Sequence, residues 1–367
     1  MAGVMSNTAY LVLENGITFE GKYFGKQGEI TGEIVFTTGM TGYLETLTDP
    51  SYYGQIVLQT FPLIGNYGII PADFESAAVC ACAYIVKHPC QNPSNFRSEG
   101  SLDAFLKERG VIGIYGIDTR ALTKIIRENG VMNGKITGVK PTGKIPNDIK
   151  SYKIENSVPS VSAGEKKFYK SENSKYTVAL YDFGSKENIR RELNRLGCDV
   201  WKFPCNSTPE EILKIYPDGI MLSNGPGDPA DNTEIIKNLK SLLKSGVPIF
   251  GICLGHQLMA LASGFSTNKL KYGHRGANQP VKDLHSGKVY ITSQNHGYAV
   301  VSKTIDARVA DEWFINVNDG TCEGITYKNA PAFSVQFHPE ACGGPHDTNF
   351  LFDKFIQSME AKNNASK

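Results

Sequence analysis

A cysteine between two glycines is the feature of this 367-residue sequence that most directly indicates chemistry. In GICLGHQ, residues 251–257, Cys253 lies two positions from Gly251 and two from Gly255, after the apolar run VPIF. Small residues on both sides allow a tight strand-to-helix turn that projects a nucleophile. The helix start favours a thiolate, and the N–H of Leu254 can stabilise an oxyanion. A buried structural cysteine is the alternative, and the spacing disfavours it.

A thiolate nucleophile needs a base and a group that orients the base, and His338 and Glu340 are the best candidates. His338 ends the predicted strand AFSVQF, and Pro339 holds the residue before it extended. Residues two apart in an extended chain share a face, so the two side chains can align. His256 is expected to point away from the thiol. The alternative for HPE is a solvated strand end, which the pairing with GICLG makes the weaker interpretation.

A glycine-rich loop, LSNGPGDPAD at residues 222–231, follows the predicted strand GIML. Gly225 and Gly227 allow backbone N–H groups to approach a ligand closely. The spacing also fits a nucleotide fingerprint, but Pro226 and Pro229 remove donors from a phosphate cradle. In addition, no acidic residue ends a strand about 20 positions later. We therefore predict an oxyanion loop that faces the cysteine.

The order of strands and helices predicts two domains. Residues 1–140 indicate a mixed, β-rich α+β domain that begins with a hairpin at Asn15–Gly16. Residues 141–174, rich in Lys, Ser, Asn and Pro, are expected to be an interdomain linker with one short helix. Within residues 175–367 strands alternate with helices, which predicts a doubly wound α/β domain with a nucleophile elbow. Sites in such sheets lie at the carboxyl ends of strands.

Composition argues against several classes of function. Lys and Arg number 38 and Asp and Glu 37, for a net charge of +1, so no nucleic-acid surface is indicated. No apolar run approaches the roughly 18 residues that span a bilayer. The start, MAGVMSNTAY, lacks a signal-peptide pattern, so we expect a cytoplasmic protein without membrane contact.

Eight cysteines in a chain of this kind are expected to be reduced thiols. Four potential ligands in CACAYIVKHPC, namely Cys80, Cys82, His88 and Cys90, can share one strand face and so could hold zinc. The Cys-x-Cys spacing is tighter than in ordinary structural zinc sites. A strand that happens to contain thiols is the favoured interpretation, and no metal is predicted.

The motifs resemble a known family. GICLGHQ, SNGPGDP and FHPEA resemble the class I, or triad, glutamine amidotransferases, whose catalytic residues would here be Cys253, His338 and Glu340. GEIVFTTGMTGYLETLTDPSYYGQIV, GIDTRALTKIIRENG and QNHGYAV make nearly the whole chain similar to the small subunits of carbamoyl phosphate synthetase. Amidotransferases of other pathways share the second domain but not the first of these stretches.

The resemblance implies a glutaminase that cleaves the side-chain amide of L-glutamine through a γ-glutamyl thioester and passes ammonia to a large subunit. That partner would use ATP with Mg to make carbamoyl phosphate from bicarbonate, for arginine, pyrimidines or both. This chain, which lacks a Gly-x-x-x-x-Gly-Lys-Ser/Thr motif, would carry no cofactor. The implied glutamine contacts are Ser51, Gly225, Gly227, Leu254, Gln257, Asn295, Gly297 and Tyr298. Because Ser51 belongs to the predicted first domain, the site is expected to open toward the domain interface.

Two other classes fit parts of the pattern. A peptidase with the same triad would need no partner, and the DPSY and QNHGY stretches argue against it. A scaffolding subunit could keep the fold without catalysis, and the intact Cys253, His338 and Glu340 argue against that.

Overall fold

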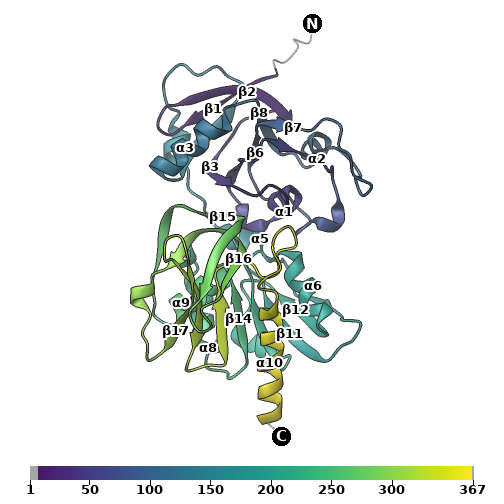
Figure 1. The fold of residues 1–367 in the computed structure, drawn as a ribbon, viewed down its shortest axis with the longest axis vertical. Helices are drawn as coiled ribbons and strands as arrows, with labels where there is room; N and C mark the ends of the chain where they lie inside the picture. Colours follow the sequence, from purple (N-terminus) through teal and green to yellow (C-terminus); the bar gives the residue numbers. More distant parts are fainter. Residues whose placement is uncertain (1–6, 366–367) are drawn as a thin grey trace. The chain divides into compact units, whose positions relative to one another are not determined.

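The computed structural model describes residues 7–365, and the chain divides into two compact units between Glu155 and Asn156 (Figure 1). Both units mix strands with helices, so the predicted α/β character is confirmed. Among the described residues, no helix combines the length and apolar character needed to cross a membrane.

The N-terminal unit is built on a closed barrel of seven strands in the order β1-β2-β8-β6-β4-β3-β9. The predicted hairpin is present: β1 (Thr8–Leu13) pairs antiparallel with β2 (Thr18–Gly25), and Gly16 in the turn has a φ of 87°. The other barrel strands are β3 (Ile30–Thr37), β4 (Gln55–Gln59), β6 (Ala83–Val86), β8 (Ile112–Tyr115) and β9 (Met132–Thr137). A short pair, β5 (Leu63–Ile64) and β7 (His88–Pro89), forms a separate sheet.

Two helices of this unit begin where their capping residues predict. The Ser101 hydroxyl accepts from the N–H of Ala104 at the start of α2 (Leu102–Glu108), and Asp118 accepts from Ala121 in α3 (Thr119–Asn129). A further helix, α1 (Tyr43–Thr48), was not predicted; its N-cap, Gly42, has no side chain to signal a start. Two 3₁₀ turns complete the unit, η1 (Pro50–Tyr52) and η2 (Pro71–Asp73).

The four potential zinc ligands do not share one strand face, the arrangement that the zinc alternative required. Cys82 precedes β6, whereas His88 lies on β7 and is exposed. The Cys82 sulfur lies 3.9 Å from the Tyr152 hydroxyl, and burial raises the pKa of Cys80 to about 11. A thiol with a raised pKa is a poor zinc ligand at neutral pH, because the thiolate is the form that binds metal. None of the eight cysteines, all of which lie within the described residues, forms a disulfide.

The predicted linker contains more regular structure than expected. It forms α4 (Asn147–Ser151), α5 (Ser157–Val161) and β10 (Lys167–Tyr169). Ile149 of α4 and Val158 of α5 are fully buried, and β10 pairs antiparallel with β12. Single apolar residues in a polar segment therefore anchor it, which composition alone does not reveal.

The C-terminal unit is organised around a ten-stranded sheet in the order β10-β12-β11-β13-β14-β19-β18-β17-β15-β16. Five consecutive strands of it are parallel: β12 (Cys198–Phe203), β11 (Tyr176–Tyr181), β13 (Gly219–Leu222), β14 (Ile249–Ile252) and β19 (Ala332–Val335). The remaining strands pair antiparallel: β18 (Cys322–Tyr327), β17 (Ala310–Asn316), β15 (Thr267–Asp283) and β16 (Val289–Val300). Neither β15 nor β17 was predicted.

Helices cover both faces of this sheet. They are needed on both because apolar side chains alternate between the two faces along each buried strand. On β11, Ala179 and Tyr181 face one core and Val178 and Leu180 face the other. The first core is closed by α7 (Pro209–Leu213), α8 (Thr233–Leu242) and α9 (Leu254–Ala262), and the second by α6 (Glu187–Arg195) and α10 (Phe350–Ala365). α7 begins with a capping box, in which the Thr208 hydroxyl accepts from the Glu211 N–H and the Glu211 carboxylate accepts from the Thr208 N–H. The 3₁₀ turns are η3 (Pro229–Asp231) and η4 (Ser302–Thr304).

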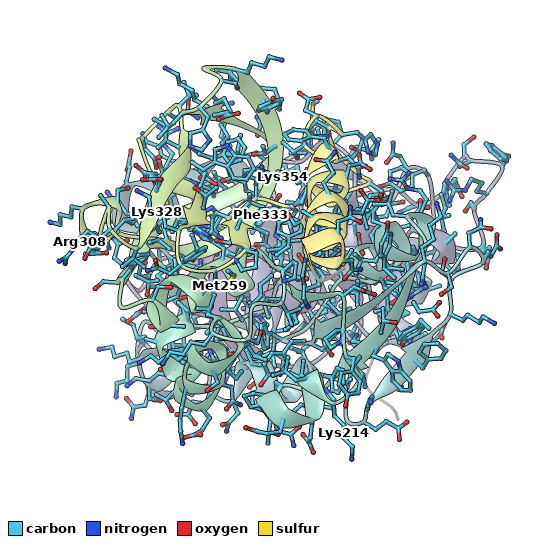
Figure 2. The ribbon with its side chains drawn as sticks, turned by 90° about the horizontal axis from the view of Figure 1, so that it is seen from below. Lys214, Met259, Arg308, Lys328, Phe333 and Lys354 are labelled. Carbon is cyan, nitrogen blue, oxygen red and sulfur yellow. The ribbon has the colours of Figure 1, made fainter. Side chains whose placement is uncertain are left out.

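Aromatic rings fill the second core beneath α10. The rings of Phe250 and Phe333 stack with their centroids 4.5 Å apart, and Phe352 and Phe355 of α10 pack against Phe250. Figure 2 shows Lys354 of α10 beside Phe333; its ammonium lies 5.8 Å from that ring centroid. This packing supports the buried strands β14 and β19, which end at the candidate site.

Candidate active site

Cys253 lies at a strained turn between β14 and α9. Its backbone adopts φ 54° and ψ −103°, one of three positive φ values among non-glycine residues in the described chain. A side chain at Gly251 would place its Cβ 2.7 Å from the sulfur of Met259, and one at Gly255 would lie 2.6 Å from the Leu222 carbonyl oxygen. Both flanking glycines are therefore required for this turn to pack, as the sequence predicted.

The candidate base follows a neighbouring parallel strand. β14 and β19 are paired, and the Cys253 N–H donates to the Val335 carbonyl at 2.8 Å. β19 ends at Val335, three positions earlier than predicted, and the His338 N–H then donates to Ser293 of β16 at 2.9 Å. The Cys253 sulfur lies 3.7 Å from the carbonyl oxygen of Asn295, also on β16. Both side chains thus emerge at the carboxyl ends of adjacent strands, against one segment of β16.

His338 and Glu340 interact as their spacing predicted. His338 Nδ1 lies 2.7 Å from Glu340 Oε1, and both side chains are buried. His338 Nε2 is buried without a hydrogen-bond partner among the described residues. A neutral imidazole whose Nδ1–H is held by a carboxylate carries its lone pair on Nε2, which is the arrangement of a general base.

Lys186 and the imidazolium form of His338 favour the ionised form of Glu340. Burial raises the pKa of Glu340, but attraction to His338 and to Lys186, with the His338 hydrogen bond, outweighs burial and brings it to about 2. The Lys186 ammonium lies 3.6 Å from Glu340 Oε1, and the Asn188 amide donates to the Glu340 carbonyl. These roles of Lys186 and Asn188 were not predicted from the sequence.

The glycine loop packs closely on the start of α9. A Cβ at Gly225 would clash with the Phe183 carbonyl oxygen and lie 2.7 Å from a methyl of Leu254. Gly227 has a φ of 89°, and its Cβ would clash with the hydroxyl of Ser157. The Gly255 N–H donates to Ser223 at 3.0 Å. Neither glycine can be replaced without moving this loop, which lies beside the first turn of α9.

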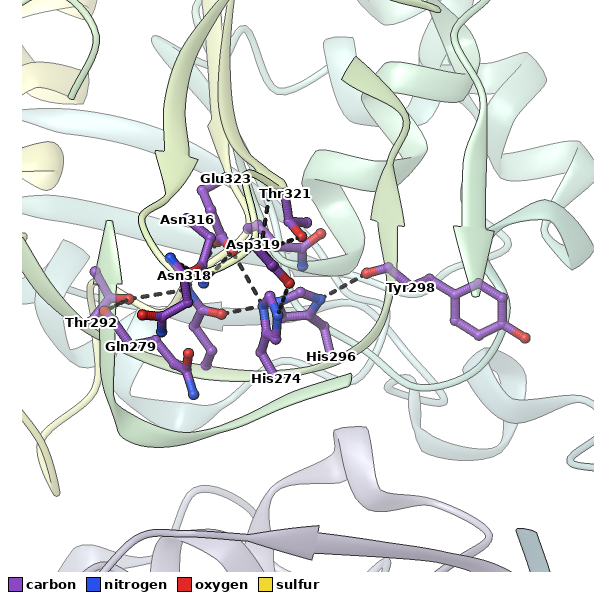
Figure 3. A network of polar contacts seen from close by, with 12 residues as sticks. His274, Gln279, Thr292, His296, Tyr298, Asn316, Asn318, Asp319, Thr321 and Glu323 are labelled. Carbon is purple, nitrogen blue, oxygen red and sulfur yellow. Dashed lines mark hydrogen bonds and ion pairs between the residues drawn. The ribbon is translucent and has the colours of Figure 1, made fainter. Parts of the chain in front are cut away.

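The QNHGY segment of β16 is held beside the cysteine. The Gln257 amide nitrogen donates to the carbonyl of Tyr298 at 2.7 Å and to Gln336 Oε1 at 2.9 Å. That Tyr298 oxygen also lies 2.8 Å from His296 Nδ1, whereas the Tyr298 ring points away from the histidine (Figure 3). A Cβ at Gly297 would lie 3.3 Å from the Arg275 guanidinium. Four of the predicted glutamine contacts are thus gathered near Cys253: Leu254, Gln257, Asn295 and Tyr298.

Ser51 and His256, two other residues named from the sequence, have different surroundings. Ser51 belongs to η1 of the N-terminal unit, where its N–H donates to Asp49 at 2.9 Å and its side chain is largely buried. His256 is fully buried, with Nδ1 2.8 Å from the Ser334 hydroxyl, and burial lowers its pKa to about 3. His256 is therefore a neutral core residue.

Two models of known protein families match this chain, one in each unit. The model for "Glutamine amidotransferase class-I" matches residues 179–358, the part that contains the cysteine, histidine and glutamate described above. The model for "Carbamoyl-phosphate synthase small chain, CPSase domain" matches residues 11–136.

Curated relatives match over nearly the whole chain. The carbamoyl phosphate synthase small chain of Bacillus cereus is 52% identical over 351 residues, covering 95% of each chain. That of Bacillus caldolyticus is 50% identical, covering 94% of this chain and 95% of the relative, and that of Clostridium perfringens is 50% identical, covering 95% and 99%. The chain belongs to the carbamoyl phosphate synthase small chain family, and as such is a glutamine-hydrolysing enzyme component.

Proposed function

We propose that this chain hydrolyses the side-chain amide of L-glutamine with a Cys253, His338 and Glu340 triad, and delivers the ammonia to a large subunit that makes carbamoyl phosphate. The observation that carries the proposal is the strained turn at Cys253, a nucleophile elbow, together with His338, whose Nδ1 is held by Glu340 and whose Nε2 has no hydrogen-bond partner in the described part of the chain. The family supports the rest of the assignment.

The first half of the reaction forms a thioester. His338 Nε2 takes the thiol proton as the Cys253 sulfur attacks the γ-carbonyl carbon of glutamine. The carbonyl oxygen becomes an oxyanion that accepts from the N–H of Leu254 and from the Gly225 loop. As the oxyanion collapses, the C–N bond breaks and the imidazolium gives its proton to the leaving nitrogen, which departs as ammonia.

The second half releases glutamate. His338 Nε2 removes a proton from water, whose oxygen attacks the thioester carbon. The C–S bond then breaks, and the imidazolium returns its proton to the sulfur of Cys253. Glu340 stabilises the imidazolium in both halves without itself taking a proton. Backbone N–H groups polarise the γ-carbonyl of glutamine, so the proposed mechanism requires no metal ion bound to this chain.

Substrate contacts and partner form part of the same proposal. Glutamine would be held by eight residues: Ser51, Gly225, Gly227, Leu254, Gln257, Asn295, Gly297 and Tyr298. ATP with Mg and bicarbonate would bind the large subunit, and this chain would carry no cofactor. We further propose a cytoplasmic location for this chain.

Cys253→Ser tests the proposal directly. A hydroxyl is nearly isosteric with the thiol but far less acidic, so glutamine hydrolysis should be abolished while the fold persists. Glutamate release would be measured for parent and variant, and carbamoyl phosphate synthesis from added ammonia would be measured with the large subunit present. Ammonia-dependent synthesis should persist. A variant that still uses glutamine at the parent rate would rule out Cys253 as nucleophile, and a parent that cleaves peptides would favour the rival peptidase function.

A further inference from the structure

A buried polar network lies behind the QNHGY segment, on the antiparallel part of the sheet (Figure 3). His274 of β15 and His296 of β16 are cross-strand partners whose rings meet edge to face, 4.9 Å apart. His274 Nε2 lies 2.9 Å from Asp319 Oδ2, and His274 Nδ1 lies 3.4 Å from Glu323 Oε1. Glu323 is fully buried, and its other oxygen lies 3.0 Å from the amide of Gln294. None of these residues except Gln294 and His296 belongs to a motif that the function explains.

The hydrogen-bond partners determine where the protons are. Both nitrogens of His296 face oxygen atoms in the structure, Tyr298 O at 2.8 Å and Gln294 Oε1 at 3.1 Å. Burial, with the nearby charge of His274, holds the pKa of His296 well below its ordinary value, so this imidazole is neutral with one N–H. A carbonyl can only accept, so that hydrogen is on Nδ1, and the lone pair on Nε2 needs a donor.

Gln294 supplies this donor if the oxygen and nitrogen of its side-chain amide exchange places. Which end of such an amide is the nitrogen is decided by its hydrogen-bond partners. The NH₂ of Gln294 then faces His296, and its oxygen faces Glu323 Oε2 and the Thr292 hydroxyl, which can donate to it instead of to the Gln279 carbonyl. Two facing acceptors repel, so Glu323 must carry a proton on Oε2 and donate it. Burial raises the pKa of Glu323, the direction that this arrangement requires. Glu323 Oε1 remains an acceptor for His274 and for Asn316, whose amide lies 3.4 Å away.

A metal site is the competing interpretation of the same residues. The potential ligand atoms of His274, His296 and Glu323 all lie within 4.8 Å of one another. Metal binding requires a lone pair on each histidine. Burial lowers the pKa of His274, but hydrogen bonds to Asp319 and Glu323 outweigh it and raise the pKa to about 9. His274 is therefore doubly protonated at neutral pH and has no lone pair to offer, so hydrogen bonding is favoured over metal binding.

The network ends at the candidate site. His296 Nδ1–H donates to the carbonyl of Tyr298, the same oxygen that receives the Gln257 amide of α9. The neighbouring Asn295 carbonyl lies 3.7 Å from the Cys253 sulfur. A rotation of the His296 ring would release Tyr298 and shift a backbone segment that includes three of the proposed glutamine contacts. In turn, His296 is fixed through Gln294 by Glu323, and Glu323 by His274.

We propose that Glu323, as a neutral carboxylic acid, and His274, as its cationic anchor, are positioning residues that hold residues 295–298 in the geometry that binds glutamine. This inference rests on the proposed glutaminase function. Neither residue contacts the reacting atoms, so their loss should weaken substrate binding more than it slows the chemical step.

Three replacements of Glu323 test the proposal in the full chain. In Glu323→Gln the amide NH₂ replaces the acid proton and the oxygen still accepts from His274, so KM for glutamine should stay within about twofold of the parent. Glu323→Asp keeps the acid but shortens its reach, and Glu323→Ala removes it; both should raise KM by about tenfold or more, with kcat changed much less. His274→Gln should raise KM as well. The control is Glu234→Ala, an exposed residue of α8, which should leave both constants unchanged.

The outcomes are distinct. Equal damage from Glu323→Gln and Glu323→Asp, or an unchanged KM in Glu323→Asp, would overturn the neutral-acid role, and this pair remains informative if Glu323→Ala does not fold. Stoichiometric metal in the purified parent, measured by mass spectrometry and absent from His274→Gln, would overturn it in favour of a metal site. A parent without glutaminase activity would instead contradict the proposed function, since every comparison here is made relative to an active parent.

Discussion

Two histidines of the C-terminal unit, His338 buried and His274 partly buried, are paired with carboxyl groups, and they differ in the surroundings of the second ring nitrogen. His338 is held at Nδ1 by Glu340, 2.7 Å away, and its Nε2 has no hydrogen-bond partner among the described residues. His274 faces a carboxyl group on both sides, Asp319 at Nε2 and Glu323 at Nδ1. The first histidine can exchange a proton with a substrate through Nε2, whereas each ring nitrogen of the second faces a carboxyl oxygen, at 2.9 Å and 3.4 Å.

The carboxyl groups next to the two histidines differ in their pKa and therefore in their charge. Cations hold Glu340 ionised with a pKa of about 2 despite burial, whereas burial raises the pKa of Glu323. An ionised carboxylate next to a histidine with one open nitrogen stabilises the imidazolium that forms in catalysis. A neutral carboxyl group in a closed chain of hydrogen bonds supports geometry. Pairing of histidine with carboxylate is therefore not by itself evidence of catalysis; the open nitrogen is the informative feature.

Of the changes predicted here, His338→Asn should reduce glutamine hydrolysis the most. Asparagine keeps a polar side chain of similar reach but cannot shuttle a proton, and the proposed base acts in both halves of the reaction. We expect kcat for glutamine hydrolysis to fall by about 10³-fold, with glutamine binding little changed. Steady-state glutamate release and equilibrium glutamine binding provide the two measurements. His346→Asn, an exposed histidine shortly after the triad, serves as control and should behave as the parent does.

Glu340→Gln should have a smaller effect. Its amide oxygen can still accept from His338 Nδ1, but the charge that stabilises the imidazolium is lost. Because Glu340 orients the base and does not itself transfer a proton, we expect a decrease in kcat of about 100-fold, at the low end of what acid–base catalysis contributes. Glu234→Gln on the exposed face of α8 controls for the removal of one negative charge. A larger loss for Glu340→Gln than for His338→Asn would contradict the assignment of base and orienting group.

The difference between the two histidines also separates what the sequence can predict from what it cannot. His338 and Glu340 are two positions apart in an extended chain, so local geometry is enough to align them. Cys253 and its glycines are likewise a local pattern, since the close contacts that require glycine arise within one turn. His274 and Asp319 are 45 positions apart and meet only because β15, β17 and β18 pair in one sheet.

The strands that position His274 were missed for the same reason. β15 reads TNKLKYGHRGANQPVKD, which is polar, contains glycine and proline, and is broken by two register shifts in its pairing with β16. No alternation of apolar residues marks it as a strand; its pairing with β16 and β17 makes it one. By contrast β11, β13 and β14 are short apolar runs bounded by turn residues and were predicted correctly.

The smallest expected effect concerns the pH dependence of stability at His274. Its folded pKa is raised to about 9, above the ordinary value of 6.5, by hydrogen bonds to Asp319 and Glu323 that outweigh burial. A raised pKa means that the stabilisation is fully present below pH 6.5 and is lost as the pH rises through 9. The free energy of unfolding of the parent should therefore exceed that of His274→Gln by roughly 1–3 kcal/mol at pH 6, and the difference should shrink toward pH 10. Urea denaturation at several pH values measures this difference, and taking the difference cancels titrations common to both proteins, such as those of the cysteines.

The control is His285→Gln, at an exposed histidine beyond the end of β15, which should follow the parent at every pH. A parent–variant difference that stays constant from pH 6 to pH 10 would show that His274 does not carry a stabilised proton in the folded chain.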